Sequence, residues 1–264
     1  MDNGFYCQKR SRGVITDVLF VLVLLLFLLC QACAGIPCRD VHNAQEEKDN
    51  IYTLLAYSVV LKDWQNSDME HNRGYNIGSV LVENESGKVV YWARNSVNVT
   101  RNMSQHGEVR LMNCYLANNK VRKLDRYTVY TTLEPCAMCS GMMMLTSVPR
   151  TVYGQSDPSY GKAIERLELD SAYGPYPRHV ESSPSISRER CRLDALYDKY
   201  RNVNKDAHIT IFLTTDEAKK VYDDAYNDLL SFRVAFPENQ PALDQAREYL
   251  KNVPEKYQAD CPPQ

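Results

Sequence analysis

Two short segments of the chain carry residue types suited to metal and acid–base chemistry. The first is His106-Gly107-Glu108, and the second is Pro135-Cys136-Ala137-Met138-Cys139. Zinc prefers nitrogen and sulfur ligands, and a catalytic zinc site usually has three protein ligands so that water can take the fourth position. We therefore expect His106, Cys136 and Cys139 to bind one Zn²⁺ ion per chain. Glu108 is the carboxylate expected to move protons in catalysis.

The elements that must position the two cysteines can be predicted from the local sequence. Residues 126–132 are β-branched and aromatic, which is typical of a strand. The strand leads into a helix that includes Pro135 in its first turn and extends through Met144. Cys136 and Cys139, three residues apart, would then project from one face of that helix.

A second helix is expected after the histidine and to end near Asn119, because apolar residues recur there at helical spacing. Residues two apart do not share a helix face, so His106 and Glu108 converge on one ion only if His106 lies at the start of the helix. The sequence therefore predicts that two helix N-termini meet at the metal.

The motifs resemble those of the CMP/dCMP-type zinc deaminase superfamily, which has an H-x-E and a P-C-x-x-C pattern. The run Thr132 to Met142 and the later Arg150-Thr-Val-Tyr-Gly154 are most similar to the tRNA adenosine deaminase and guanine deaminase branch. The resemblance covers roughly Ile51 to Lys162. It implies a hydrolytic deaminase in which Glu108 takes a proton from water and delivers protons to the ring nitrogen and the departing amine, so that ammonia leaves.

Asn95 is the residue to which the resemblance assigns substrate binding. It stands eleven residues before His106, where that branch has an asparagine that contacts the base. The alternative is a turn residue, because the segment follows the end of a predicted strand.

The sequence indicates the type of reaction more clearly than the substrate. Gly107 stands where tRNA adenosine deaminases usually have alanine and fungal cytosine deaminases have glycine, and the run after Gly154 departs from that of the tRNA enzymes. We expect a nucleobase or nucleoside of amino-purine or cytosine type. The alternatives are adenosine in tRNA or another nucleic-acid substrate, and a catalytically inactive zinc-binding relative.

The N-terminal segment 1–34 reads as a signal peptide or an N-terminal anchor. Basic residues precede the apolar stretch 18–30, and the small residues 32–34 follow it. The apolar run is shorter than a membrane span. We expect an exported protein, periplasmic or secreted, with an uncleaved anchor through residues 14–34 or a lipoprotein signal ending at Cys33 as alternatives.

Charge and compartment bear on the expected partners. The chain has 31 Lys and Arg against 33 Asp and Glu, so it has no overall basic excess of the kind that binds nucleic acid. A small-molecule base or nucleoside is therefore the expected partner, and nucleic acid is disfavoured. Membrane contact is expected only through an uncleaved N-terminal segment. The resemblance also implies a homodimer.

Four cysteines remain after removal of the leader and the two zinc ligands: Cys38, Cys114, Cys191 and Cys261. In an oxidising compartment they can form two disulfides with three alternative pairings. We expect Cys38 and Cys261 to join the ends of the mature chain. Cys114 is equally well interpreted as a buried thiol on the helix that follows His106.

The order of predicted elements indicates an α/β fold, a three-layer α/β/α sandwich with a mixed five-stranded sheet. The zinc deaminase domain is expected at 44–235 with an insertion at 164–206, followed by a C-terminal helix and tail at 236–264. Tyr173, Tyr176 and Arg178 in the insertion are candidates for substrate contact, with an exposed surface loop as the alternative. Strands are expected at 75–82, 88–93, 126–132, 150–153 and 208–214, and further helices at 44–62, 188–200, 216–232 and 242–251.

Overall fold

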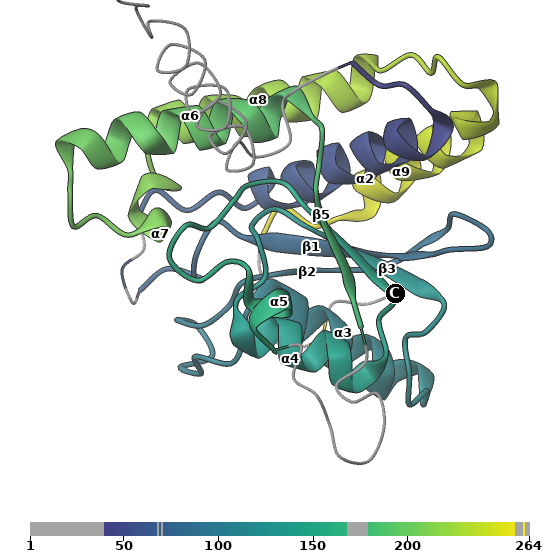
Figure 1. Cartoon of the computed structure of the whole chain (residues 1–264), viewed down its shortest axis with the longest axis horizontal. Helices are drawn as coiled ribbons and strands as arrows, with labels where there is room; N and C mark the ends of the chain where they lie inside the picture. Colours follow the sequence, from purple (N-terminus) through teal and green to yellow (C-terminus); the bar gives the residue numbers. More distant parts are fainter. Residues whose placement is uncertain (1–39, 68, 70, 168–178, 257–260, 262–264) are drawn as a thin grey trace, which may run out of the picture. The chain divides into compact units, whose positions relative to one another are not determined.

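A mixed five-stranded sheet lies at the centre of the structure, which is a computed structural model (Figure 1). The structure describes residues 40–67, 69, 71–167, 179–256 and 261, which belong to one unit, Cys38–Gln264. The strand order is β2-β1-β3-β4-β5. The strands are β1 Gly78–Glu83, β2 Val89–Arg94, β3 Tyr127–Thr131, β4 Arg150–Tyr153 and β5 Glu181–Pro184.

The strand directions bring three connecting segments together at one end of the sheet. β1 runs antiparallel to β2 and β3, whereas β3, β4 and β5 are parallel. The register pairs Gly78 with Arg94, Ser79 with Thr131, and Thr131 with Tyr153. The segments that follow β2, β3 and β4 therefore leave the sheet at the same end.

Helices cover both faces of the sheet, so the predicted three-layer α/β/α sandwich is confirmed (Figure 1). α3, α4 and α5 lie on one face, and α2, α6, α7, α8 and α9 lie on the other. The helices are α2 Ala44–Leu61, α3 Gly107–Asn119, α4 Ala137–Thr146, α5 Ala163–Leu167, α6 Arg188–Val203, α7 Ile209–Phe212, α8 Asp216–Ser231 and α9 Gln240–Asn252, with a 3₁₀ turn η1 Pro237–Asn239.

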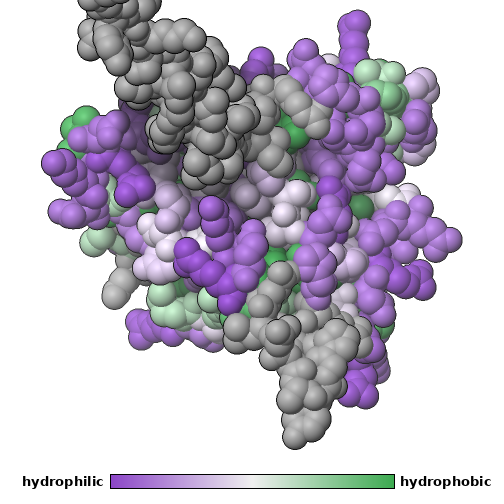
Figure 2. Space-filling model, viewed as in Figure 1, coloured by the Kyte–Doolittle hydropathy of each residue, from purple (hydrophilic) through white to green (hydrophobic). Residues whose placement is uncertain are grey.

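α2 is the central helix on the face of the sheet that carries more helices, and it is buried on nearly all sides. Its residues 51–60 are all buried, because α2 packs on the sheet and also contacts α8 and α9. A helix that is apolar all round belongs in a core. In contrast, the outer surface in Figure 2 is mostly hydrophilic where its residues are described, with hydrophobic side chains in small patches.

The predicted fifth strand at 208–214 is wrong. This segment begins α7, with His208 as its N-cap, while the fifth strand is Glu181–Pro184 at the edge of the sheet. Ile209, Phe212 and Leu213 are buried at helical spacing, which decides the conformation of a segment rich in β-branched residues. The true strand is short, polar and ends in proline, as an edge strand can be.

The C-terminal helix contributes to the core, although the sequence places it after the zinc deaminase domain, at 236–264. α9 packs against α2, and Leu243 and Leu250 are buried in the larger hydrophobic cluster. Glu47 of α2 accepts hydrogen bonds from the backbone N–H groups of Ala235 and Phe236, which holds the connection into η1. The C-terminal region therefore shares the core of the sandwich.

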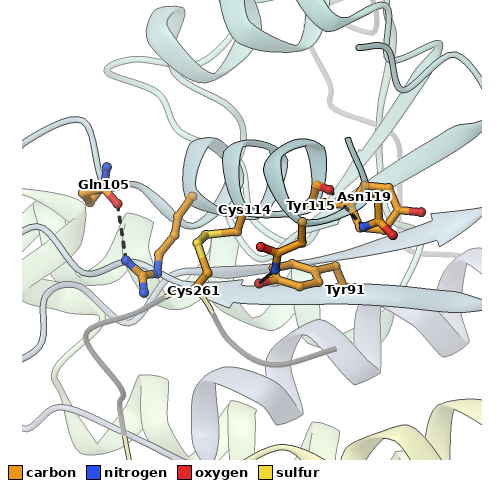
Figure 3. Close-up of a disulfide and its surroundings, with 8 residues drawn as sticks. Tyr91, Gln105, Cys114, Tyr115, Asn119 and Cys261 are labelled. Atoms are coloured by element: carbon orange, nitrogen blue, oxygen red, sulfur yellow. Dashed lines mark hydrogen bonds between the residues drawn. A yellow bond between two sulfur atoms is a disulfide. The ribbon is translucent and has the colours of Figure 1, made fainter. Parts of the chain in front are cut away.

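The expected Cys38–Cys261 disulfide is also wrong. Cys261 is bonded to Cys114 of α3, across 147 residues of sequence, so Cys114 is not a free core thiol (Figure 3). Cys191 is disulfide-bonded as well. The Cys114–Cys261 bond ties the C-terminal segment to the helix that follows His106.

The predicted leader at 1–34 lies outside the described residues, as do Tyr173, Tyr176 and Arg178. Among the helices that the structure describes, none combines the length and apolarity needed to cross a membrane.

Candidate active site

The three predicted ligands lie at the N-termini of two helices. His106 is the N-cap of α3, and Cys136 is the N-cap of α4, which begins at Ala137 and includes Cys139 in its first turn. Pro135 thus precedes the helix instead of lying in its first turn. Neither N-cap side chain makes a capping hydrogen bond, and both face the metal position. The positive ends of two helix dipoles favour thiolate at this point.

The distances between the three ligand atoms fit one zinc ion. His106 Nδ1 lies 3.6 Å from the Sγ atoms of both Cys136 and Cys139, and the two sulfurs are 3.7 Å apart. A tetrahedral ion with Zn–S of about 2.3 Å and Zn–N of about 2.0 Å requires separations of about 3.5–3.8 Å. Among the described residues, this is the one group of His, Cys and acidic side chains placed to hold a metal.

The two thiols differ in how readily they ionise. The hydrogen bond between the sulfurs lowers the pKa of Cys136 to about 4, although burial acts in the opposite direction. The same hydrogen bond, together with burial, holds the pKa of Cys139 well above its usual range. Cys136 is therefore already a thiolate at neutral pH, which is the form that binds zinc, and Cys139 would release its proton on binding.

Glu108 lies in the first turn of α3 and is 3% exposed. Its Oε1 accepts a hydrogen bond of 3.1 Å from Thr131 Oγ1 at the end of β3. Its Oε2 makes no hydrogen bond to the part of the chain that the structure describes. Burial raises the pKa of Glu108, an effect that suits a group that must hold and return a proton.

Asn95 follows β2 and is fully buried. Its Oδ1 accepts hydrogen bonds from the backbone N–H groups of Tyr75 (3.1 Å) and Val97 (3.4 Å). Its Nδ2 has no hydrogen-bond partner among the described residues. The structure therefore shows how Asn95 organises its loop, and its contact with a base remains a prediction.

A cavity of about 460 Å³ opens beside the ligand group. Its size is within the range of about 300–1,000 Å³ that is usual for small-molecule sites, and its lining is mainly apolar with a few polar groups, as such sites require. The lining residues are Tyr75, Ile77, Met103, His106, Glu108, Leu133, Glu134, Cys136, Asp157, Tyr160, His208, Ile209 and Thr210.

Most of this cavity wall was not predicted from the sequence. Tyr160 and His208 contact each other at 5.5 Å between ring centroids, although 48 positions separate them in the sequence. Asp157 follows β4, within the run after Gly154 that departs from that of the tRNA enzymes. His208 belongs to the segment predicted as a strand. The sequence therefore did not indicate that it lies at a helix start beside the cavity.

Comparison with known proteins agrees with this geometry. Residues 55–155 match the family model described as the cytidine and deoxycytidylate deaminase zinc-binding region. A tRNA-specific adenosine deaminase of Rickettsia bellii is 33% identical over 93 residues, which are 34% of this chain and 63% of that protein. A tRNA-specific adenosine deaminase of Bacillus subtilis is 34% identical over 133 residues, which are 50% of this chain and 81% of that protein.

A solved structure of guanine deaminase from Nitrosomonas europaea is 15% identical and aligns with a TM-score of 0.40 over 71% of this chain and 87% of that chain. The segment matched by the family model includes both helix starts, from His106 to Cys139. Because that match covers the ligand group and the Bacillus subtilis relative is matched over 81% of its length, the chain belongs to the cytidine and deoxycytidylate deaminase zinc-binding family.

Proposed function

We propose that this chain is a zinc-dependent hydrolytic deaminase, with one zinc per chain, that replaces the exocyclic amine of a nucleobase by oxygen. The observation that carries the proposal is the position of Glu108. Its buried carboxylate is oriented by Thr131, and its Oε2 makes no hydrogen bond within the described chain. It lines the same cavity as the predicted ligands His106 and Cys136.

The chemistry follows from these positions. Zinc held by three protein ligands lowers the pKa of a bound water to about 7 and so supplies a nucleophile near neutral pH. Glu108 takes the proton that this water loses and carries it to the ring nitrogen of the base. Glu108 then carries the proton of the hydroxyl group that has added to the ring carbon to the amine. The C–N bond breaks, and ammonia leaves while the water oxygen stays on the ring as a carbonyl.

The first substrate to consider is adenosine in RNA. The two relatives described above are named tRNA-specific adenosine deaminases, and they match the segment that contains the ligands. Enzymes that act on a base within a polynucleotide extrude it into a pocket, and the cavity beside Glu108 has a suitable volume for this purpose.

A free base or nucleoside is the second candidate, favoured by the cavity lining. Its described lining includes Glu134 and Asp157 but no lysine or arginine that would hold a phosphate. The disulfide at Cys114 also supports export, because such bonds persist in oxidising compartments, where free bases are the more accessible substrates. Export is tested directly by mass spectrometry of the protein recovered from cells. After the predicted cleavage, the measured mass should be that of a chain that begins at Gly35.

The test is ammonia release from adenine, guanine, cytosine and their nucleosides, and from an adenosine-containing RNA stem-loop. Glu108→Gln removes only the proton carrier, so we expect it to retain zinc and fold while its turnover falls by about a hundredfold or more. Cys136→Ala removes a ligand and should lose the metal.

The outcomes separate the candidates. Turnover of the RNA alone, with a steep dependence on salt, supports the nucleic-acid substrate. Turnover of a free base or nucleoside supports the second candidate. If no substrate reacts and zinc is retained, the hydrolytic proposal is wrong and the zinc site is structural.

A further inference from the structure

One side of the cavity is formed by residues 155–162, called here the wall loop, which follow β4 and contribute Asp157 and Tyr160 to the lining. A single carboxylate holds the loop at two points. Glu134 Oε2 accepts the backbone N–H of Asp157 at 3.0 Å, and Oε1 accepts that of Lys162 at 2.8 Å. Since Glu134 is buried and lies two residues before Cys136, these bonds tie the wall loop to the ligand-bearing helix start.

A second carboxylate, on α6, holds the beginning of the wall loop. Asp194 of α6 accepts the backbone N–H of Ser156 at 2.9 Å and its hydroxyl at 3.2 Å. Arg190, one turn earlier on α6, donates to Asp194 at 3.0 Å and so fixes the acceptor. α6 was expected only as a helix of an insertion, yet it supports the cavity wall.

The remaining N–H groups of residues 156–162 end on Asp157 itself. Its Oδ1 accepts from Ser159 at 2.9 Å and from Tyr160 at 3.0 Å, and its backbone oxygen accepts from Gly161 at 2.8 Å. A Cβ on Gly161 would lie 2.2 Å from Glu134 Oε2, so only glycine allows the carboxylate this close. Within residues 156–162, every backbone N–H therefore ends on one of three acidic residues, Pro158 having none.

We propose that Glu134 and Asp194 are positioning residues that set the wall loop, and with it Asp157 and Tyr160, at a fixed distance from Glu108. The inference rests on the proposed function for its kinetic part. Both carboxylate oxygens of Glu134 accept hydrogen bonds from the wall loop. Glu134 therefore holds the loop in place, and the proton transfers are carried out by Glu108. A loop held at both ends presents its side chains to a base without having to order them on binding.

Glu134→Gln and Asp194→Asn test the proposal, because an amide keeps the size of the carboxylate but offers one acceptor in place of two. The matched controls are Glu165→Gln on α5 and Asp198→Asn on α6, which make the same changes at exposed side chains of neighbouring turns. The substrate-independent measurement is hydrogen exchange of a peptide spanning 156–162. We expect exchange to be about tenfold faster in both test variants and unchanged in both controls.

The kinetic measurement uses the base or RNA that the parent enzyme deaminates. We expect KM to rise about tenfold in Glu134→Gln and Asp194→Asn, and kcat to change less, because a displaced wall loop weakens substrate binding without removing the proton carrier. The zinc content of both variants should equal that of the parent. The double variant should lose less than the product of the two single effects, since both act through one loop.

Two results would overturn the proposal: hydrogen exchange of the wall loop equal to that of the controls, or faster exchange with unchanged KM. Asp194→Asn is distant in sequence from the zinc ligands, so it decides the matter if Glu134→Gln does not fold. Absence of turnover in the parent enzyme contradicts the proposed function instead, and hydrogen exchange still shows whether the two carboxylates hold the loop.

Discussion

At the scale of single residues, the orientation of Glu108 depends on one hydroxyl. Thr131 Oγ1 donates to Glu108 Oε1 at 3.1 Å, and both side chains are buried. A hydrogen bond to a charged group contributes about 1.5–3 kcal/mol. We therefore expect Thr131→Val, which keeps the side-chain shape, to lower kcat by about tenfold or more while zinc stays bound.

Thr128→Val is the matched control for this prediction. Thr128 lies on the same strand, and its hydroxyl donates to Asn84 at 2.8 Å, at the end of β3 away from the site. Ammonia release measured for both variants separates orientation of Glu108 from a general effect on the strand. An equal loss of kcat in the two variants would contradict the role given to Thr131.

At the scale of elements, α3 is held at two places, by the sheet and by the disulfide between Cys114 and Cys261 (Figure 3). A crosslink that closes a long loop reduces the conformational entropy of the unfolded chain, with a typical effect of about 2–4 kcal/mol. We expect Cys261→Ser to lower the free energy of unfolding by about this amount, measured by urea denaturation.

The control for this prediction is the mass of the variant after alkylation, which shows whether Cys191 has kept its own disulfide. None of the three predicted zinc ligands takes part in this disulfide, so zinc content should not change. An unfolding midpoint equal to that of the parent would show that the disulfide does not constrain the unfolded chain.

At the scale of the whole molecule, the C-terminal helix completes the larger core. Leu243 of α9 is 1% exposed and packs in the cluster that surrounds α2. Truncation of a buried leucine costs about 2–5 kcal/mol. We expect Leu243→Ala to lower the free energy of unfolding by that amount, and the control Leu230→Ala, whose side chain is 48% exposed on α8, to change it far less. Equal unfolding midpoints would mean that α9 does not belong to the core.

The sequence by itself determined the layered fold and the two helix starts, and it predicted the three zinc ligands that lie there. His106, Cys136 and Cys139 are recognisable because zinc ligands have distinctive chemistry and because a strand followed by a helix start is a local pattern. Alternating strands and helices with a buried α2 leave few arrangements other than a covered sheet.

Only the tertiary structure decided the fifth strand, the disulfide partner of Cys261 and the cavity wall. The segment 208–214 has residues suited to either conformation, and burial against α6 selects the helix. The polar strand β5 exists because β4 offers an open edge for backbone pairing. Disulfide pairing and the contacts of Glu134 with the wall loop depend on distances in space between residues far apart in the chain, which spacing along the sequence does not encode.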